Sequence, residues 1–414
     1  MFPETRDTQY RLLDAWCGVA CLIVVVYHAG FALGRDEVVG AASAGWVRWG
    51  IVASLRLMSM GVPLFFVISG YCIATSADAN RRRGLSAWSF LGRRFWRIYP
   101  PYWVALFGVV ALVAALDAAG LARWHRDNSH ALRLQSPGEL SRSQWVGNLT
   151  LTETWRPLAW GAADHEPYTR VAWSLCYEEQ FYFVCFLMLW LAPTRLYGAL
   201  AVLSAVVVPV RIWAWRAGWV GRIDGSFPML WHEFAAGLAV YWRLNVARGA
   251  VAKRCVELGL TALVVVGVLQ GMRQTAGAGL FGLVLIALRR WDGLAESRAW
   301  LRALAACGRR CYSIYLVHLP VCTVGVAGLL ELGLTGFWTR VLVLVPLVSI
   351  IATAAGWSFF DLVEARFHNR PIAQPRPNLR RSFGAGDEGG VERMPRGGAK
   401  RWELADVKFE IPDL

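Results

Sequence analysis

The sequence predicts an all-α, polytopic integral membrane protein with about ten transmembrane helices. Its 414 residues are 56% hydrophobic and only 17% charged, and the mean hydropathy is +0.39. Soluble globular chains are usually less apolar and more charged. The 22 Trp residues agree with a membrane location, because indole rings favour the boundary between the bilayer and water.

Stretches long enough to cross a hydrocarbon core of about 30 Å define the expected helices. They lie near residues 13–33, 50–76, 98–120, 171–192, 197–217, 227–246, 255–273, 276–288, 311–334 and 338–366. The eighth is short and the last is long. The first stretch follows acidic residues and precedes no small-residue cleavage site, so we expect a retained helix and not a signal peptide.

The basic residues predict the orientation of the chain. With the N-terminus in the cytoplasm, the cytoplasmic connections hold most of the Lys and Arg residues, as the positive-inside rule requires. The sequence therefore predicts a multi-pass protein of the inner (cytoplasmic) membrane, N-in and C-in. The formal net charge of +14 is then mostly a topology signal, and we expect no nucleic-acid partner.

Composition also divides the chain and excludes several kinds of site. Residues 1–368 are predicted to form a membrane-embedded domain, and residues 369–414, rich in Pro, Gly and charge, a disordered cytoplasmic tail. The nine cysteines include no CxxC pair, so neither a disulfide framework nor a metal site is expected. The sequence has no GxGxxG, Walker, HExxH or GxSxG motif, which excludes the usual chemistry of soluble enzymes.

Titratable side chains within apolar helices are costly, so each one is a functional candidate. They are His28, Glu178, Glu179, His232, Glu233 and His318. Each could instead be satisfied by a neighbouring helix and serve packing alone. A poorly solvated imidazole such as His28 favours its neutral form and could act as a general base. Glu178 could orient it and stabilise its cation if the fold brings the two together.

The arginines before the third predicted span suggest an anion site. Arg93 and Arg97 are one helical turn apart, a spacing suited to a phosphate or pyrophosphate group. The alternative is that this cluster only sets the topology and attracts anionic lipid headgroups.

Seven segments together carry a family resemblance. They are LDAWCGVACLIVVVYH, GVPLFFVISGYCIA, FLGRRFWRIYPPYW, VAWSLCYEEQFYF, HEFAAGLA, GRRCYSIYLVHLP and FFDLVEARF, in this order. In order and placement the chain resembles the acyltransferase 3 family of membrane O-acyltransferases. The resemblance implies transfer of an acyl group, often acetyl from acetyl-CoA, to a hydroxyl of an extracytoplasmic carbohydrate or glycolipid. It implies acyl-CoA as donor substrate and no bound cofactor.

The resemblance also implies roles for individual residues. His28 is the essential histidine and Glu178 the glutamate of the tryptophan-serine-leucine motif. Glu179, Tyr315, His318 and Ser69 are candidates for catalytic support, and Gly70 is expected to serve packing. Arg93, Arg94 and Arg97 are expected to meet the acyl-CoA, while Glu364 matches the acidic residue that closes the last helix. Direct transfer and an acyl-histidine intermediate are equally compatible with these residues.

One position departs from the family pattern. An arginine is expected eleven residues before the histidine, and this chain has Cys17 there. A neutral thiol neither neutralises a phosphate nor holds a carboxylate. If the family mechanism holds, Cys17→Arg should keep or raise acyl transfer in membranes. Abolished transfer in a folded variant would show that the site is rebuilt around the thiol.

Two further functions compete with acyl transfer. Buried His and Glu residues across about ten helices also suit a proton-coupled transporter or flippase of a glycoconjugate. An inactive relative that binds the acyl donor or the sugar is the third alternative, and the cysteine at position 17 keeps it open.

Overall fold

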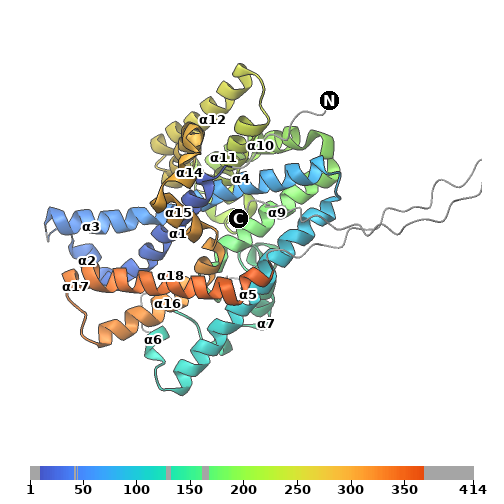
Figure 1. The fold of residues 1–414 in the computed structure, drawn as a ribbon. Coiled ribbons are helices and arrows are strands. Elements are labelled where there is room, and N and C mark those ends of the chain that lie inside the picture. Colours follow the sequence, from blue (N-terminus) through green and yellow to red (C-terminus); the bar gives the residue numbers. More distant parts are fainter. Residues whose placement is uncertain (1–9, 42, 44, 127–131, 161–166, 368–414) are drawn as a thin grey trace, which may run out of the picture. The chain divides into compact units, whose positions relative to one another are not determined.

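The computed structural model describes residues 10–41, 43, 45–126, 132–160 and 167–367. Within these residues the chain forms helices and contains no β-strand, so the predicted all-α class is confirmed (Figure 1). Contacts group the chain up to Arg370 into one compact unit. The predicted tail, 369–414, lies outside the described residues, and a domain boundary at residue 368 stays a prediction.

The helices follow one another closely along the chain. The first half contains α1 (Leu12–Ala29), α2 (Gly34–Gly40), α3 (Trp46–Leu57), α4 (Gly61–Arg82), α5 (Ala87–Ala118), α6 (Arg123–Arg126), α7 (Arg142–Thr150), α8 (Arg156–Trp160) and α9 (Ala172–Leu191). The second half contains α10 (Leu196–Arg216), α11 (Trp231–Asn245), α12 (Ala250–Leu269), α13 (Arg273–Leu288), α14 (Leu294–Ser297), α15 (Ala299–Gly308), α16 (Cys311–Glu331), α17 (Phe337–Thr339) and α18 (Val345–Leu362).

Several of these helices are long and apolar enough to cross a membrane, as expected for a multi-pass protein. Among the described residues, six such stretches are Leu12–Leu33, Trp46–Arg82, Ala87–Ala118, Pro193–Arg216, Cys311–Glu331 and Phe337–Arg366. Four further predicted ranges coincide with α9, α11, α12 and α13. Of these, α11 has 15 residues and α13 has 16, fewer than the roughly 20 of a full crossing. The count of ten and the N-in, C-in orientation stay predictions.

The start of α5 differs from the sequence-based expectation. The helix begins at Ala87, where the Ser86 side chain accepts a hydrogen bond from the backbone N–H of Ser89, and it continues through Pro100 and Pro101. The predicted span began only at residue 98, because the preceding arginines lower the hydropathy. These arginines therefore lie on a rigid helix and not in a loop.

Close helix contacts depend on glycine. A Cβ atom on Gly70 of α4 would lie 2.1 Å from the Phe234 carbonyl oxygen of α11. A Cβ atom on Gly237 of α11 would lie 1.9 Å from the Val67 carbonyl oxygen of α4. Neither distance is possible, so the two backbones pack directly on each other, as small residues permit in membrane proteins. This contact supports the expected packing role of Gly70.

The segment around α7 is anchored to α5 through its backbone. Ser141 and Gln144 form a capping box that starts α7. Three consecutive carbonyl oxygens at the end of α7 accept hydrogen bonds from α5 side chains: Asn148 from Tyr102 at 2.8 Å, Leu149 from Trp103 at 2.9 Å and Thr150 from Tyr99 at 3.0 Å. The connection between α5 and α9 is thus fixed against the middle of α5.

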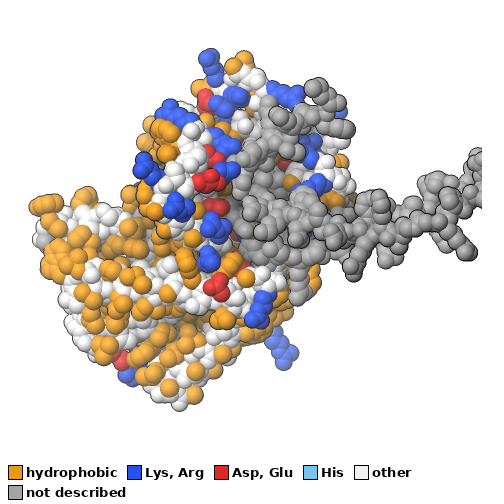
Figure 2. Space-filling model, viewed as in Figure 1, with side chains coloured by type: hydrophobic (Ala, Val, Ile, Leu, Met, Phe, Trp, Pro, Cys, Tyr) orange, Lys and Arg blue, Asp and Glu red, His pale blue; other side chains and the backbone are white. Residues whose placement is uncertain are grey.

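Hydrophobic and basic side chains gather on different parts of the surface. Figure 2 shows hydrophobic side chains over α3 and α18, and Lys and Arg gathered over α12, α14 and α15. Exposed tryptophans on α3, Trp46 and Trp49, belong to the hydrophobic part. A protein that meets both lipid and water is expected to separate its surface in this way.

Candidate active site

Three of the charged residues singled out by the sequence, Arg94, Arg97 and Glu178, meet at one cavity. Its volume is about 110 Å³, and α1, α4, α5, α9 and α16 all contribute to its wall. Its polar or reactive side chains include Cys17, Ser69, Arg94, Arg97, Glu178 and Tyr315. These positions are far apart in sequence, so the cavity is a product of the tertiary fold.

Glu178 is held within this wall by two hydroxyl groups. Ser69 Oγ donates a hydrogen bond to its Oε1 atom at 2.7 Å, and the Tyr182 hydroxyl donates to the same oxygen at 2.5 Å. One carboxyl oxygen thus accepts both hydrogen bonds. Ser69 therefore supports Glu178 directly, whereas Gly70 beside it packs against α11.

The three arginines of α5 separate into two groups. Arg93 donates to Ser89 Oγ at 2.7 Å and to Asn80 Oδ1 at 2.5 Å, so its guanidinium joins α5 to the end of α4. Arg94 and Arg97 line the cavity and make no hydrogen bond or ion pair within the described residues. The Arg94 guanidinium lies 5.3 Å from the centre of the Tyr182 ring. Two cations are thus available to an anionic ligand, and Arg93 is not the third.

Tyr315 connects the cavity to a pair of histidines. Its hydroxyl donates to the Val171 carbonyl oxygen and lies 2.5 Å from Ser174 Oγ, which is then the donor between the two hydroxyls. Its ring centre lies 5.7 Å from that of His318, one turn along α16. Tyr315 lies in the cavity wall, and its ring therefore connects the cavity to His318.

His28 and His318 contact each other. Their ring centres are 4.9 Å apart, and His318 Nε2 lies 3.3 Å from His28 Nδ1. The Nδ1 atom of His28 is also 2.9 Å from the Val24 carbonyl oxygen. His318 is fully buried, while the His28 ring is half-buried beside Tyr27. His28 contacts His318 but is not part of the cavity wall.

The expected contact between His28 and Glu178 is not present. The hydrogen bonds of Glu178 go to Ser69 and Tyr182, and those of His28 go to Val24 and His318; none joins the two side chains. The physical reason is the fold: Glu178 faces α4, whereas His28 faces α16.

Other candidates lie away from the cavity. Glu179 is turned toward Tyr99 of α5, 3.5 Å from its hydroxyl, because neighbouring residues on a helix face different directions. His232 and Glu233 are buried near Arg211 and lie outside the cavity wall. Glu364, just after α18, accepts a hydrogen bond from Ser313 near the start of α16. No described group of three or more His, Cys, Asp or Glu side chains is arranged to bind a metal.

Cys17 occupies the cavity wall together with Arg94 and Arg97. It is fully buried. An arginine at this position would add a third cation to the same space, which is the physical basis of the expected gain from Cys17→Arg.

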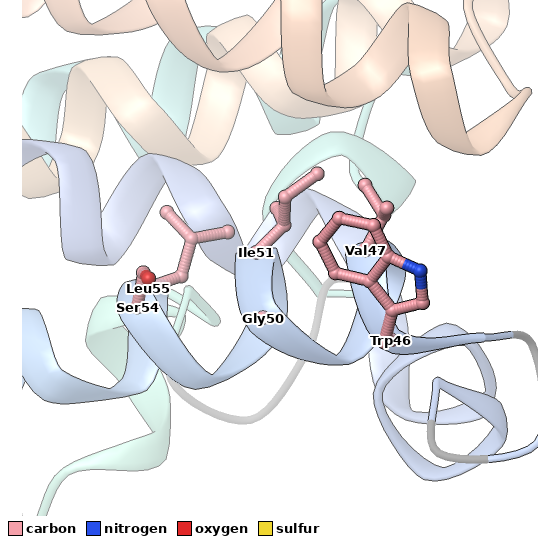
Figure 3. Close-up of a pocket in the computed structure, with 6 residues that line it drawn as sticks. All are labelled: Trp46, Val47, Gly50, Ile51, Ser54 and Leu55. Atoms are coloured by element: carbon pink, nitrogen blue, oxygen red, sulfur yellow. The ribbon is translucent and has the colours of Figure 1, made fainter.

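A second hollow lies along α3 and has no comparable chemistry. Its volume is about 340 Å³, and its lining consists of Trp46, Val47, Gly50, Ile51, Ser54 and Leu55. All six residues come from a single helix, and none is titratable (Figure 3). The hollow is therefore an apolar surface feature and not a candidate active site.

Sequence reasoning missed Ser174 and Tyr182. Both lie four residues from Glu178, on the same face of α9, and this spacing was readable from the sequence. Ser174 bonds to Tyr315 and Tyr182 bonds to Glu178, so the face as a whole builds the site.

A helical membrane fold with a cationic cavity agrees with a membrane-bound acyltransferase. The sequence profile described as an acyltransferase domain, that of the acyltransferase 3 family, matches residues 11–359. The chain belongs to this family, which confirms the resemblance, and it is an acyltransferase.

Two relatives are similar in sequence to the chain. A protein described as a membrane-bound transacylase, BcsY of Komagataeibacter xylinus, is 28% identical over 341 residues, which cover 77% of this chain and 74% of the relative. Protein 2 in the picA locus of Rhizobium radiobacter is 33% identical over 149 residues, which cover 36% of this chain and 67% of the relative. No solved structure shows a significant match to the chain.

Proposed function

We propose that the protein transfers an acyl group, acetyl in the first instance, from acyl-CoA to a hydroxyl of an extracytoplasmic carbohydrate or glycolipid. The proposal includes ten crossings of the inner membrane with both termini in the cytoplasm, so that donor and acceptor approach from opposite sides. The observation that carries it is the pair of unpaired cations, Arg94 and Arg97, in a cavity next to the His28–His318 contact.

The proposed reaction assigns a task to each group. Arg94 and Arg97 bind phosphate groups of the CoA, because guanidinium groups suit phosphate oxygens geometrically. His28 Nε2 takes the proton of the acceptor hydroxyl as its oxygen attacks the thioester carbon. The carbon–sulfur bond then breaks, and the CoA thiolate leaves with the proton from His28. In the acyl-histidine route, His28 Nε2 is instead the nucleophile: it attacks the thioester carbon and the CoA thiolate leaves. The acceptor oxygen then displaces Nε2 from the acyl carbon, and the hydroxyl proton passes to the thiolate.

Glu178 keeps a supporting task in this proposal. Its carboxyl group holds Ser69 and Tyr182 in place and lies in the same cavity wall as the two arginines. It organises the donor side of the site, while the histidines act on the acceptor hydroxyl.

Incubation of membranes with labelled acetyl-CoA tests the proposed function. We expect label to pass to an extracytoplasmic carbohydrate or glycolipid only in membranes that contain the protein. Membranes without the protein are the control. Binding of the donor without transfer would instead support the inactive relative.

The transporter alternative predicts movement of a glycoconjugate without any acylation. The cavity arginines favour the acyltransferase, because unpaired cations in a cavity have an evident ligand in CoA phosphates and no evident role in proton coupling. Glycoconjugate that is translocated but unlabelled would favour the transporter.

A further inference from the structure

Backbone carbonyl oxygens fix the position of the proton on the rings of His28 and His318. His318 Nδ1 lies 2.7 Å from the Tyr315 carbonyl oxygen and 3.2 Å from that of Ile314. His28 Nδ1 lies 2.9 Å from the Val24 carbonyl oxygen. Carbonyl oxygens only accept hydrogen bonds, so each Nδ1 atom must be the one that bears a hydrogen.

The remaining nitrogens then have defined roles. A neutral imidazole has one N–H group, so Nε2 of His318 is an acceptor. This acceptor lies 3.3 Å from Nδ1 of His28. The hydrogen on that Nδ1 atom is shared between His318 Nε2 and the Val24 carbonyl oxygen. The lone pair of His28 is therefore on Nε2, the nitrogen that the proposed reaction uses.

We propose that His318 is a positioning residue for His28. It accepts a hydrogen bond from Nδ1 of His28, keeps that ring in the tautomer with a basic Nε2, and stabilises the cation that forms when Nε2 takes the hydroxyl proton. An acceptor behind a catalytic imidazole has this effect in general, and a carboxylate is the more usual choice. This inference rests on the proposed function and assigns to His318 the role that sequence reasoning gave to Glu178.

The location of His318 suits a neutral acceptor. The side chain is fully buried, and two carbonyl oxygens already hold its Nδ1 atom. A carboxylate at position 318 would bring an unpaired charge into an apolar interior, at a high cost in free energy. An imidazole supplies the acceptor without adding a charge in the resting enzyme.

A pair of substitutions separates this role from packing. The amide oxygen of His318→Gln can accept the hydrogen bond from His28, whereas His318→Leu fills similar space and cannot. We expect His318→Leu to lower kcat about tenfold to a hundredfold, the size of one lost hydrogen bond to a charged group, with little change in the KM for acetyl-CoA. His318→Gln should retain most of the activity.

A spectroscopic measurement makes the inference independent of activity. Nitrogen-15 NMR of histidine-labelled protein should show a protonated Nδ1 and an unprotonated Nε2 on His28. The His318→Leu variant should show a mixture of both tautomers. Size-exclusion elution and thermal unfolding in detergent identify folded variants.

Several results would overturn the positioning role. One is a wild-type His28 with its proton on Nε2. Another is a folded His318→Leu enzyme with wild-type kcat, and a third is a folded His318→Gln enzyme as slow as His318→Leu. Failure of the proposed function gives a different result from failure of the positioning role. Wild-type membranes would then transfer no acyl group, whereas the expected histidine tautomers could still be observed by NMR.

Discussion

His28→Ala is expected to lower acyl transfer by about 10² to 10⁴-fold, the usual contribution of a general base. The side chain supplies the only nitrogen that the proposed site offers to an acceptor hydroxyl, since Nδ1 of the same ring is held by Val24 and His318. The loss should appear in kcat, because the donor arginines stay in place. Initial rates with labelled acetyl-CoA in membranes measure it.

Tyr27→Phe is the matched control for this variant. Tyr27 is adjacent to His28, and its ring packs edge-on against the imidazole. Phe keeps this ring contact, so the control should transfer acyl groups at the wild-type rate. Wild-type transfer by folded His28→Ala protein would reject the proposed chemistry, including an acyl-histidine intermediate.

Arg94→Gln combined with Arg97→Gln is expected to lower kcat/KM for acetyl-CoA by about 10² to 10⁴-fold. Each guanidinium can make a charge-assisted hydrogen bond to a phosphate, and such bonds contribute about 1.5–3 kcal/mol each. The effect should appear mainly in KM, because the histidine pair is unaffected. Rates measured over a range of donor concentrations separate KM from kcat.

Arg83→Gln is the control for charge alone. Arg83 is exposed just after α4 and is not part of the cavity wall, so its loss reduces the basic charge of the region without touching the site. We expect it to leave KM unchanged. Equal effects of Arg83→Gln and either cavity substitution would mean that the arginines act only through general surface charge.

Hydropathy predicted the position of the helices but not their full length. The apolar window of α4 ends near residue 76, whereas the helix continues to Arg82, and α5 begins eleven residues before its predicted window. Backbone hydrogen bonds continue a helix beyond the apolar residues, so polar and basic turns are missed by an apolar count. Single-sequence hydropathy is therefore a guide to lipid contact and not to helix ends.

The candidate site was predictable only in part. The sequence singled out Glu178, Arg94 and Arg97, which line the cavity together. Their partners depend on tertiary contacts that no local pattern encodes. Ser69 and Glu178 are 109 positions apart, and His28 and His318 are 290 positions apart. This is why sequence reasoning paired His28 with Glu178, whereas the fold pairs it with His318.

The attachment of the segment at 148–150 to α5 has a consequence for variation among relatives. The acceptors there are main-chain carbonyl oxygens, which every amino acid supplies. The attachment to α5 therefore tolerates substitution at Leu149 and Thr150, provided that Tyr99, Tyr102 and Trp103 persist, whereas the buried Asn148 side chain also accepts a hydrogen bond from the Tyr168 backbone N–H. Substitution can thus change the outer face of the segment while its docking on α5 is kept.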